Sequence, residues 1–160
     1  MSAGEKSRVP GSSFSTQKPI NNGYLLDTNT VSELTKPRPN TGLLKFLAPL
    51  PEYRLFLSVL TIGELVSGIH RLVESNKKRD LWTWLTTDLV ARFNERILPV
   101  DFDSAHLWGQ WEAESRGYGE VLPAIDALLA ATAFSNGLAI VTRNTKHFSK
   151  MHVRVENPWT

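Results

Sequence analysis

Tyr24-Leu25-Leu26-Asp27-Thr28-Asn29 is an apolar run that meets a carboxylate, a hydroxyl and an amide where a strand should end. Apolar residues without polar alternation fit a strand that is covered on both faces, as in a parallel sheet. The ligand crevice of such a sheet lies at the carboxyl ends of its strands, where Asp27 would stand. An Asp in this position can equally cap a helix or form a turn. The functional interpretation therefore depends on whether later segments bring more carboxylates to the same edge.

The order of a buried strand followed by a helix recurs along the chain. Short apolar runs predict further strands at 55–59, 97–100, 138–141 and, at an edge, 153–155. Helical patterns lie between them. One is an alanine-rich helix at 123–133 that stops at Asn136-Gly137. Another is a long amphipathic helix that follows the basic run at 77–79 and carries Leu81, Trp84, Leu85, Leu89 and Phe93. This alternation predicts an α/β fold, a parallel sheet with helices on both faces.

Composition narrows the class of protein. The 160 residues predict one domain, and 41% hydrophobic content is enough for a core. Residues 1–20 are rich in Ser, Gly, Lys and Pro, so we expect a disordered leader before a folded domain at 21–160. The absence of cysteine excludes disulfides, thiolate metal sites and a Cys nucleophile. No apolar run is long enough for a membrane span or a signal peptide, which predicts a cytoplasmic protein without a membrane partner.

Two further acids follow the pattern of Asp27. Glu64 comes after the second strand in Thr61-x-x-Glu64, which is either a capping box or an acid that faces the same crevice. Thr30-x-x-Glu33 has the same form and predicts the start of a short helix. Asp126 is the only charge in the body of the alanine-rich helix. A stabilising contact with the helix dipole normally needs an exposed face, which this helix lacks, so a functional role is favoured for Asp126.

The three acids together predict a metal site. Asp27, Glu64 and Asp126 would repel one another in one crevice unless a cation neutralised them. Oxygen ligands select a hard ion such as Mg²⁺ or Mn²⁺, which leaves coordination positions open for phosphate. This set predicts metal-assisted hydrolysis of a phosphodiester. The formal net charge of +2 is compatible with a polyanionic substrate but does not require one.

At this point the chain resembles the PIN-domain ribonucleases, and among them the VapC and FitB toxins of type II toxin–antitoxin modules. The motifs that carry the resemblance are Leu26–Asn29, Thr61–Leu65, Asp126–Thr132, Val141–Asn144 and Asn157–Trp159. The resemblance implies a three-layer α/β/α PIN-like domain with a central, mainly parallel sheet. It also implies an endoribonuclease that depends on Mg²⁺ or Mn²⁺, a cognate antitoxin that docks beside the acidic pocket, and a homodimer.

Residue roles follow from the same resemblance. Asp27, Glu64 and Asp126 match the metal-binding and catalytic acids of the family. Thr28, Asn29 and Thr142 match the supporting polar groups.

The chain departs from the family at the fourth catalytic position. Relatives often have an acid after Thr-Arg or shortly before the following Phe, where this chain has Asn144 and His147. Asn144 can offer a carbonyl oxygen without a charge, so we expect one metal site to survive and a second to be weak or substrate-dependent. His147 is either a phosphate or proton-transfer group or a surface residue. Arg143 and Lys146 are candidates for RNA-backbone contacts, or solvated surface charges.

Other classes of protein stay open. Asn144 allows a binding module that has lost turnover and acts through its antitoxin complex. A phosphatase with a strand-end nucleophile is disfavoured, because Asp27-Thr28-Asn29 lacks the second Asp that would protonate the leaving group. A dinucleotide-binding domain is disfavoured because no glycine-rich loop follows the first strand.

Overall fold

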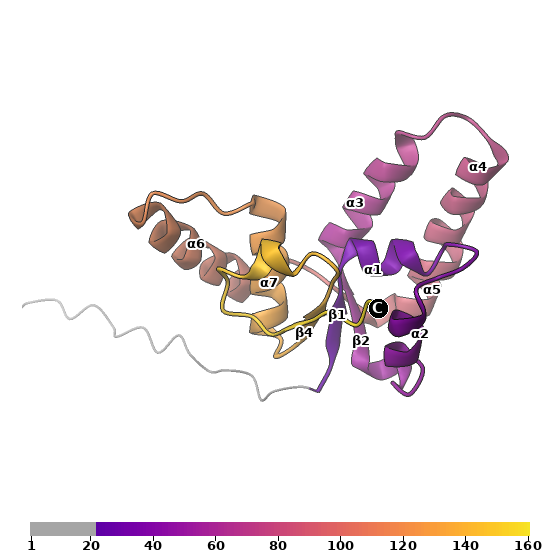
Figure 1. Ribbon diagram of the computed structural model, residues 1–160. Helices are drawn as coiled ribbons and strands as arrows, with labels where there is room; N and C mark the ends of the chain where they lie inside the picture. Colours follow the sequence, from indigo (N-terminus) through magenta and orange to yellow (C-terminus); the bar gives the residue numbers. More distant parts are fainter. Residues whose placement is uncertain (1–21) are drawn as a thin grey trace, which may run out of the picture.

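The computed structural model describes residues 22–160, which form a five-stranded parallel sheet with helices on both faces (Figure 1). The strands are β1 (Tyr24–Leu26), β2 (Leu55–Ser58), β3 (Ile97–Leu98), β4 (Ala139–Val141) and β5 (Val155–Glu156). Their order across the sheet is β3-β2-β1-β4-β5, so β1 lies at the centre. All five predicted strands are present, with bounds within two residues of those predicted. The leader predicted for residues 1–20 lies outside the described residues.

Helices follow the strands as the sequence predicts. They are α1 (Thr28–Glu33), α2 (Thr41–Leu47), α3 (Val59–His70), α4 (Asn76–Thr83), α5 (Val90–Phe93), α6 (Phe102–Gly117) and α7 (Ala124–Ser135). Single 3₁₀ turns form η1 (Glu52–Arg54), η3 (Asn94–Arg96) and η4 (Thr145–Phe148), and η2 (Trp84–Leu89) is a π-helical segment. The predicted long amphipathic helix is thus one continuous run of α4, η2 and α5, and the basic residues 77–79 that were predicted to precede it lie inside α4.

The two faces of the sheet bury separate cores. Leu25 and Ile140 pack in the core that includes residues of α6 and α7. Leu26 and Val141 pack in the core that includes residues of α1 to α5. Successive side chains of a strand point to opposite faces, so β1 and β4 are buried on both. Figure 1 shows α6 and α7 on one side of β1 and the other helices on the opposite side, which confirms the three-layer α/β/α fold.

The start of α1 differs from the prediction. Asp27 is the N-cap, because its carboxylate accepts a hydrogen bond from the Thr28 N–H at 2.8 Å. The predicted capping box of Thr30 and Glu33 is therefore wrong. Glu33 instead accepts the Asn40 N–H at 2.9 Å.

The end of α7 places β4 beside β1. Gly137 has a φ of 67°, a left-handed conformation that glycine adopts without strain. The Gly137 N–H donates to the Phe134 carbonyl at 3.1 Å, and the Leu138 N–H donates to the Ala133 carbonyl at 2.9 Å. These two bonds close the helix at the predicted Asn136-Gly137 stop, and the chain enters β4 two residues later.

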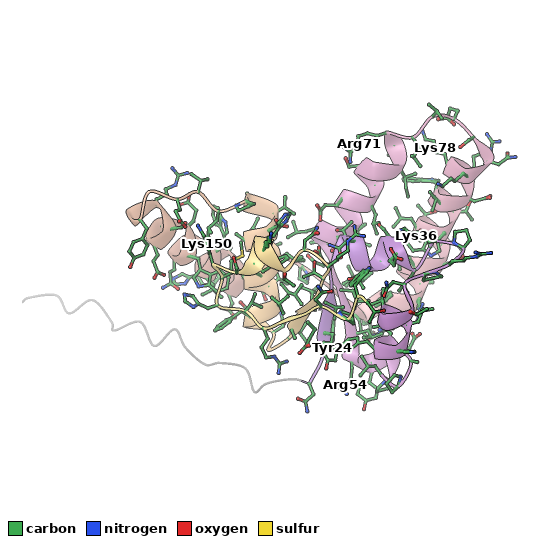
Figure 2. All side chains as sticks on the ribbon, in the orientation of Figure 1. Tyr24, Lys36, Arg54, Arg71, Lys78 and Lys150 are labelled. Carbon is green, nitrogen blue, oxygen red and sulfur yellow. The ribbon has the colours of Figure 1, made fainter. Side chains whose placement is uncertain are left out.

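The amino-terminal edge of the sheet and the C-terminal segment are fixed by other contacts. Tyr24 and Arg54 lie side by side at that edge, with the guanidinium 5.4 Å from the ring centre (Figure 2). Asn40 donates to the Thr160 carbonyl at 2.9 Å and accepts the Thr160 N–H at 3.3 Å, which anchors the end of the chain to the start of α2. Within residues 22–160, no helix is long and apolar enough to cross a membrane.

Candidate active site

A row of buried polar residues lies at the carboxyl edge of the three central strands. The register pairs Leu25 with Phe56 and Leu26 with Val141, which places Asp27 level with Ser58 on one side and Thr142 on the other. Asp27 is 6% exposed, and the other two side chains are fully buried. Buried polar groups need hydrogen-bond partners, so the residues that bond to this row can be identified. The row and its partners form the candidate site.

Asp27 is held by three donors. Its Oδ1 accepts the Thr28 N–H at 2.8 Å. Its Oδ2 accepts the Thr142 hydroxyl at 2.8 Å and the Asn29 side-chain amide at 3.0 Å. The capping role and the site role considered from the sequence are therefore compatible, because the same carboxylate caps α1 and stands at the edge of the sheet.

The predicted supporting residues form a network around Asp27. The Asn29 amide also donates to Thr142 Oγ1 at 3.1 Å, and its carbonyl oxygen accepts the Arg143 N–H at 3.1 Å. Thr142 Oγ1 further accepts the Asn144 N–H at 3.0 Å. These bonds tie the turn after β4 to the first turn of α1. Asn144 joins the network through its backbone, and the residue is exposed.

Glu64 reaches this network through Thr28. The Thr28 hydroxyl donates to Glu64 Oε1 at 2.7 Å, and Glu64 is exposed on α3. The capping alternative for Glu64 is excluded because Ser58 caps α3, with its hydroxyl 3.0 Å from the Leu60 N–H. Thr61 lies inside the helix, and its buried hydroxyl has no hydrogen-bond partner in the described part of the chain.

Asp126 faces the same edge from the first turn of α7, and a histidine contacts it. His147 Nδ1, on η4, lies 3.0 Å from Asp126 Oδ2. From the sequence, His147 could have either a role in the site or an ordinary place on the surface. Its contact with Asp126 was not predicted. The one feature of the sequence that pointed to a role of His147 in the site was its position before Phe148, where PIN-domain relatives often have an acid.

The two aspartates of this site have no lysine or arginine partner in the part of the chain that the structure describes. Burial raises the pKa of the Asp27 carboxyl, the hydrogen bonds from Thr142 and Thr28 oppose that rise, and the charge of Asp126 adds to it. In residues 22–160, no Lys or Arg forms an ion pair with Asp27 or Asp126. A cation at this position would therefore favour the ionised carboxylates.

The donor atoms decide which ion fits. Asp27, Asp126 and Glu64 offer only oxygen, which suits Mg²⁺ or Mn²⁺. No three His, Cys, Asp or Glu side chains of the described residues lie close enough together to hold an ion between them. Mg²⁺ is commonly bound by one or two carboxylates, with waters and substrate phosphates completing its coordination. The pair of Asp27 and Asp126 fits such an ion, whereas Glu64 is linked to the pair only through Thr28.

The predicted RNA contacts lie at the rim. Arg143 and Lys146 are exposed on the turn that carries Asn144 and His147. Neither forms an ion pair with an acid of residues 22–160, so both cations are available to a polyanion.

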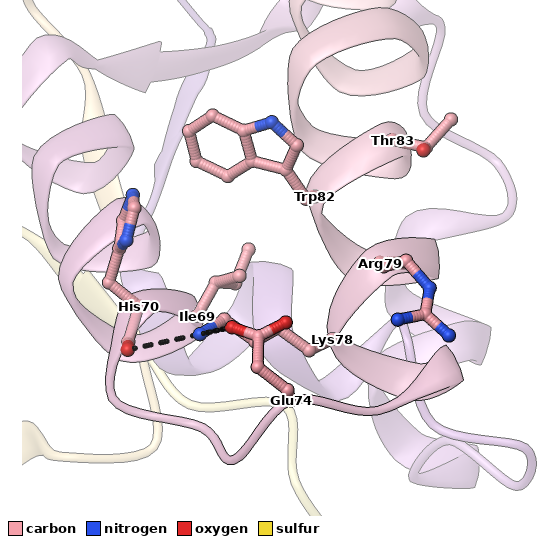
Figure 3. Close-up of a pocket in the computed structure, with 7 residues that line it drawn as sticks. All are labelled: Ile69, His70, Glu74, Lys78, Arg79, Trp82 and Thr83. Carbon is pink, nitrogen blue, oxygen red and sulfur yellow. Dashed lines mark hydrogen bonds and ion pairs between the residues drawn. The ribbon is translucent and has the colours of Figure 1, made fainter.

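A separate pocket of about 390 Å³ lies between α3 and α4 (Figure 3). Trp82 and His70 face it with ring centres 5.2 Å apart, and Ile69 also lines it. Lys78 closes one end through bonds to Glu74 at 2.7 Å and to the His70 carbonyl at 3.4 Å. None of the predicted site residues lines this pocket, so it is distinct from the acidic site.

Comparison with known proteins agrees with this arrangement. The sequence profile of the PIN domain matches residues 24–153, and the chain therefore belongs to the PIN-domain family. The chain is 36% identical to the toxin FitB of Neisseria gonorrhoeae over 135 residues, which cover 84% of this chain and 97% of that protein. It is 29% identical to the VapC ribonuclease Y4jK of Sinorhizobium fredii, covering 84% and 96%.

The solved structures give the same result. The crystal structure of FitAcB from Neisseria gonorrhoeae matches with a TM-score of 0.78 and 35% identity, covering 85% of this chain and 98% of that chain. Within the PIN-domain family, the chain thus groups with the VapC and FitB toxins of toxin–antitoxin systems. The family that the motifs predicted is confirmed.

Proposed function

We propose that this chain is the toxin of a type II toxin–antitoxin module and a metal-dependent endoribonuclease. The observation that carries the proposal is Asp27, a buried carboxylate beside Asp126 without a Lys or Arg partner among the described residues. Two neighbouring carboxylates that have no lysine or arginine partner are suited to bind a divalent cation. The name of the Sinorhizobium relative, a VapC ribonuclease, supports RNA as the substrate.

Asp27 and Asp126 would hold the Mg²⁺ or Mn²⁺ ion, and Glu64 would act beside them from α3. When bound, the ion supplies charge neutralisation at the scissile phosphate and lowers the pKa of a coordinated water. The chain has to keep its carboxylates ionised and oriented for this purpose. Thr142 and Asn29 do so by donating to Asp27, and Thr28 does so by donating to both Asp27 and Glu64.

The exposed turn after β4 would bind the substrate. Arg143 and Lys146 would contact phosphates of the RNA backbone without reading its sequence. Asn144 would contribute an uncharged amide where relatives often have an acid, so we expect one tight metal site rather than two. A cognate antitoxin would dock beside the acidic site, and we expect a cytoplasmic homodimer.

The experiment is RNA cleavage by the purified chain after its antitoxin has been removed. Total cellular RNA is incubated with Mg²⁺, Mn²⁺ or a chelator. Asp126→Asn removes one of the carboxylate charges of the site. Asp88→Asn is the matched control, because it removes an exposed charge on η2. We expect metal-dependent cleavage by the wild type and the control, and none by Asp126→Asn.

Other results would count against the proposal. Cleavage that persists in chelator, or that survives Asp126→Asn, would refute the metal mechanism. A folded wild type that cuts no RNA with either metal, but binds its antitoxin, would favour the alternative of a binding module that has lost turnover.

A further inference from the structure

His147 is linked to the acidic pair through one of its two ring nitrogens. Nδ1 lies 3.0 Å from Asp126 Oδ2. An ionised carboxylate accepts hydrogen bonds and donates none, so the hydrogen in this contact belongs to Nδ1. In the neutral ring, the other nitrogen, Nε2, is then a hydrogen-bond acceptor.

The ring stands at a fixed place on the rim of the site. The Asp126 side chain is 22% exposed and that of His147 is 54% exposed, so the imidazole leads from the carboxylate to the solvent. The His147 N–H donates to the Asn144 carbonyl at 3.1 Å, and the Asn144 N–H donates to Thr142 Oγ1. The next residue, Phe148, is 1% exposed and fixes η4 against the core. His147 is therefore anchored on the side chain and on the backbone.

An acceptor at this position needs a partner that carries a hydrogen. Arg143 and Lys146 precede His147 on the same exposed turn, and cations of this kind hold phosphate oxygens. Phosphodiester oxygens carry no hydrogen, so they do not pair with a neutral Nε2. The backbone group of RNA that can donate a hydrogen bond is the ribose 2′-hydroxyl, which DNA lacks.

We propose that His147 Nε2 accepts a hydrogen bond from a ribose 2′-hydroxyl close to the cleaved bond, and that this contact makes the site prefer RNA to DNA. The inference rests on the proposed ribonuclease function and assigns one of its specificity-determining residues. If His147 only orients Asp126, the preference for RNA has another origin, and the experiment distinguishes the two roles.

Two substitutions of His147 distinguish the role of Nδ1 from the role of Nε2. His147→Asn keeps an amide donor near the position of Nδ1, so it can still bind Asp126, but it has no atom at the position of Nε2. His147→Gln reaches the position of Nε2 and offers a carbonyl acceptor there. His152→Asn is the control, because His152 is exposed and lies beside Trp111, with ring centres 6.2 Å apart. The thermal midpoint of each variant is measured first, to show that all are folded alike.

The substrate is an RNA oligonucleotide that the wild type cleaves, taken from a randomised pool. A matched set replaces one ribose at a time near the cleaved bond with 2′-deoxyribose. For the wild type, we expect one such replacement to lower kcat/KM by about 3- to 10-fold, as the loss of one hydrogen bond does. His147→Asn should lower kcat/KM on the all-RNA substrate by a similar factor and should abolish the penalty at that position. His147→Gln should retain part of the penalty, and His152→Asn should behave as the wild type.

The proposal is overturned if no 2′-deoxy position is penalised, or if the penalty is the same in the wild type and in His147→Asn. Full activity of His147→Asn with an unchanged penalty would mean that the imidazole only orients Asp126. Failure of the proposed function has a different signature, since the wild type would then cut no RNA of the pool with either metal.

Discussion

Replacing Thr142 with Val removes one hydroxyl group and leaves the shape of the side chain almost unchanged. That hydroxyl is fully buried and donates to Asp27 Oδ2 at 2.8 Å. A hydrogen bond to a charged group contributes about 1.5–3 kcal/mol. The two donors that lose an acceptor have alternatives, because Asn29 keeps its bond to Asp27 and Asn144 is exposed to water. We therefore expect Thr142→Val to lower the free energy of unfolding by about 2 kcal/mol at neutral pH.

This cost should depend on pH in a defined direction. The folded-state pKa of Asp27 is raised, so the stability that its carboxyl contributes is complete below the ordinary pKa and is lost as pH rises through the folded value. Thr142→Val removes a contact that lowers this pKa, so the loss becomes larger once Asp27 is ionised. At a pH below the ordinary value of 3.8, where the Asp27 carboxyl is protonated, only a neutral hydrogen bond is lost, and we expect a cost of about 1 kcal/mol.

The assay is urea unfolding followed by tryptophan fluorescence at both pH values, with Thr142→Ser as the matched control. Thr142→Ser keeps the hydroxyl and loses a methyl group, which should cost about 1 kcal/mol at either pH. The acid limb of the pH–rate profile for RNA cleavage should also move to higher pH in Thr142→Val and stay unchanged in Thr142→Ser. An equal cost of Thr142→Val at both pH values would show that the hydroxyl does not stabilise the ionised carboxylate.

The remaining predictions concern four other positions. Thr28→Val removes the exposed bond to Glu64 and should change the unfolding free energy by less than about 0.5 kcal/mol, yet lower kcat/KM for RNA several-fold, and Thr28→Ser should restore it. Gly42→Ala should destabilise the fold by about 1–3 kcal/mol in urea unfolding, because its Cβ would lie 2.3 Å from the Pro158 carbonyl oxygen. Gly68→Ala, with open space around its Cβ, should instead stabilise it by about 0.4–1 kcal/mol. Arg143→Ala should weaken RNA binding and reduce the slope of log Kd against log salt by about 0.7, and an unchanged slope would remove Arg143 from the interface.

The sheet could be predicted because its strands are short, apolar on both faces and separated by clear helix signals. Leu25 and Leu26 are almost fully buried in opposite cores, which is the situation that an uninterrupted apolar run indicates. Asp27 could be placed for the same reason, since a residue directly after a central parallel strand has only one edge to occupy.

The capping-box interpretations were wrong because a local sequence pattern does not show at which residue the strand ends and the helix begins. Asp27 and Ser58 end their strands and cap the following helices, so Thr30 and Thr61 come too late to do so. The link from Thr28 to Glu64 spans 36 positions, and side-chain contacts of that range depend on how α1 and α3 pack. The contact of His147 with Asp126 depends in the same way on how η4 lies against α7.

A comparison of two acids at the ends of α1 separates a structural carboxylate from a functional one. Glu33 is 7% exposed and Asp27 is 6% exposed. Glu33 lies 2.6 Å from the Lys36 ammonium, and hydrogen bonding to Lys36 lowers the pKa of its carboxyl. Asp27 has hydrogen-bond donors but no basic partner among the described residues, and burial raises the pKa of its carboxyl. A carboxylate that only stabilises the fold is better paired than this, because an unpaired buried charge is destabilising. We therefore propose that a bound cation supplies positive charge at Asp27. Under this proposal, metal binding should stabilise this chain more than it stabilises an Asp27→Asn variant.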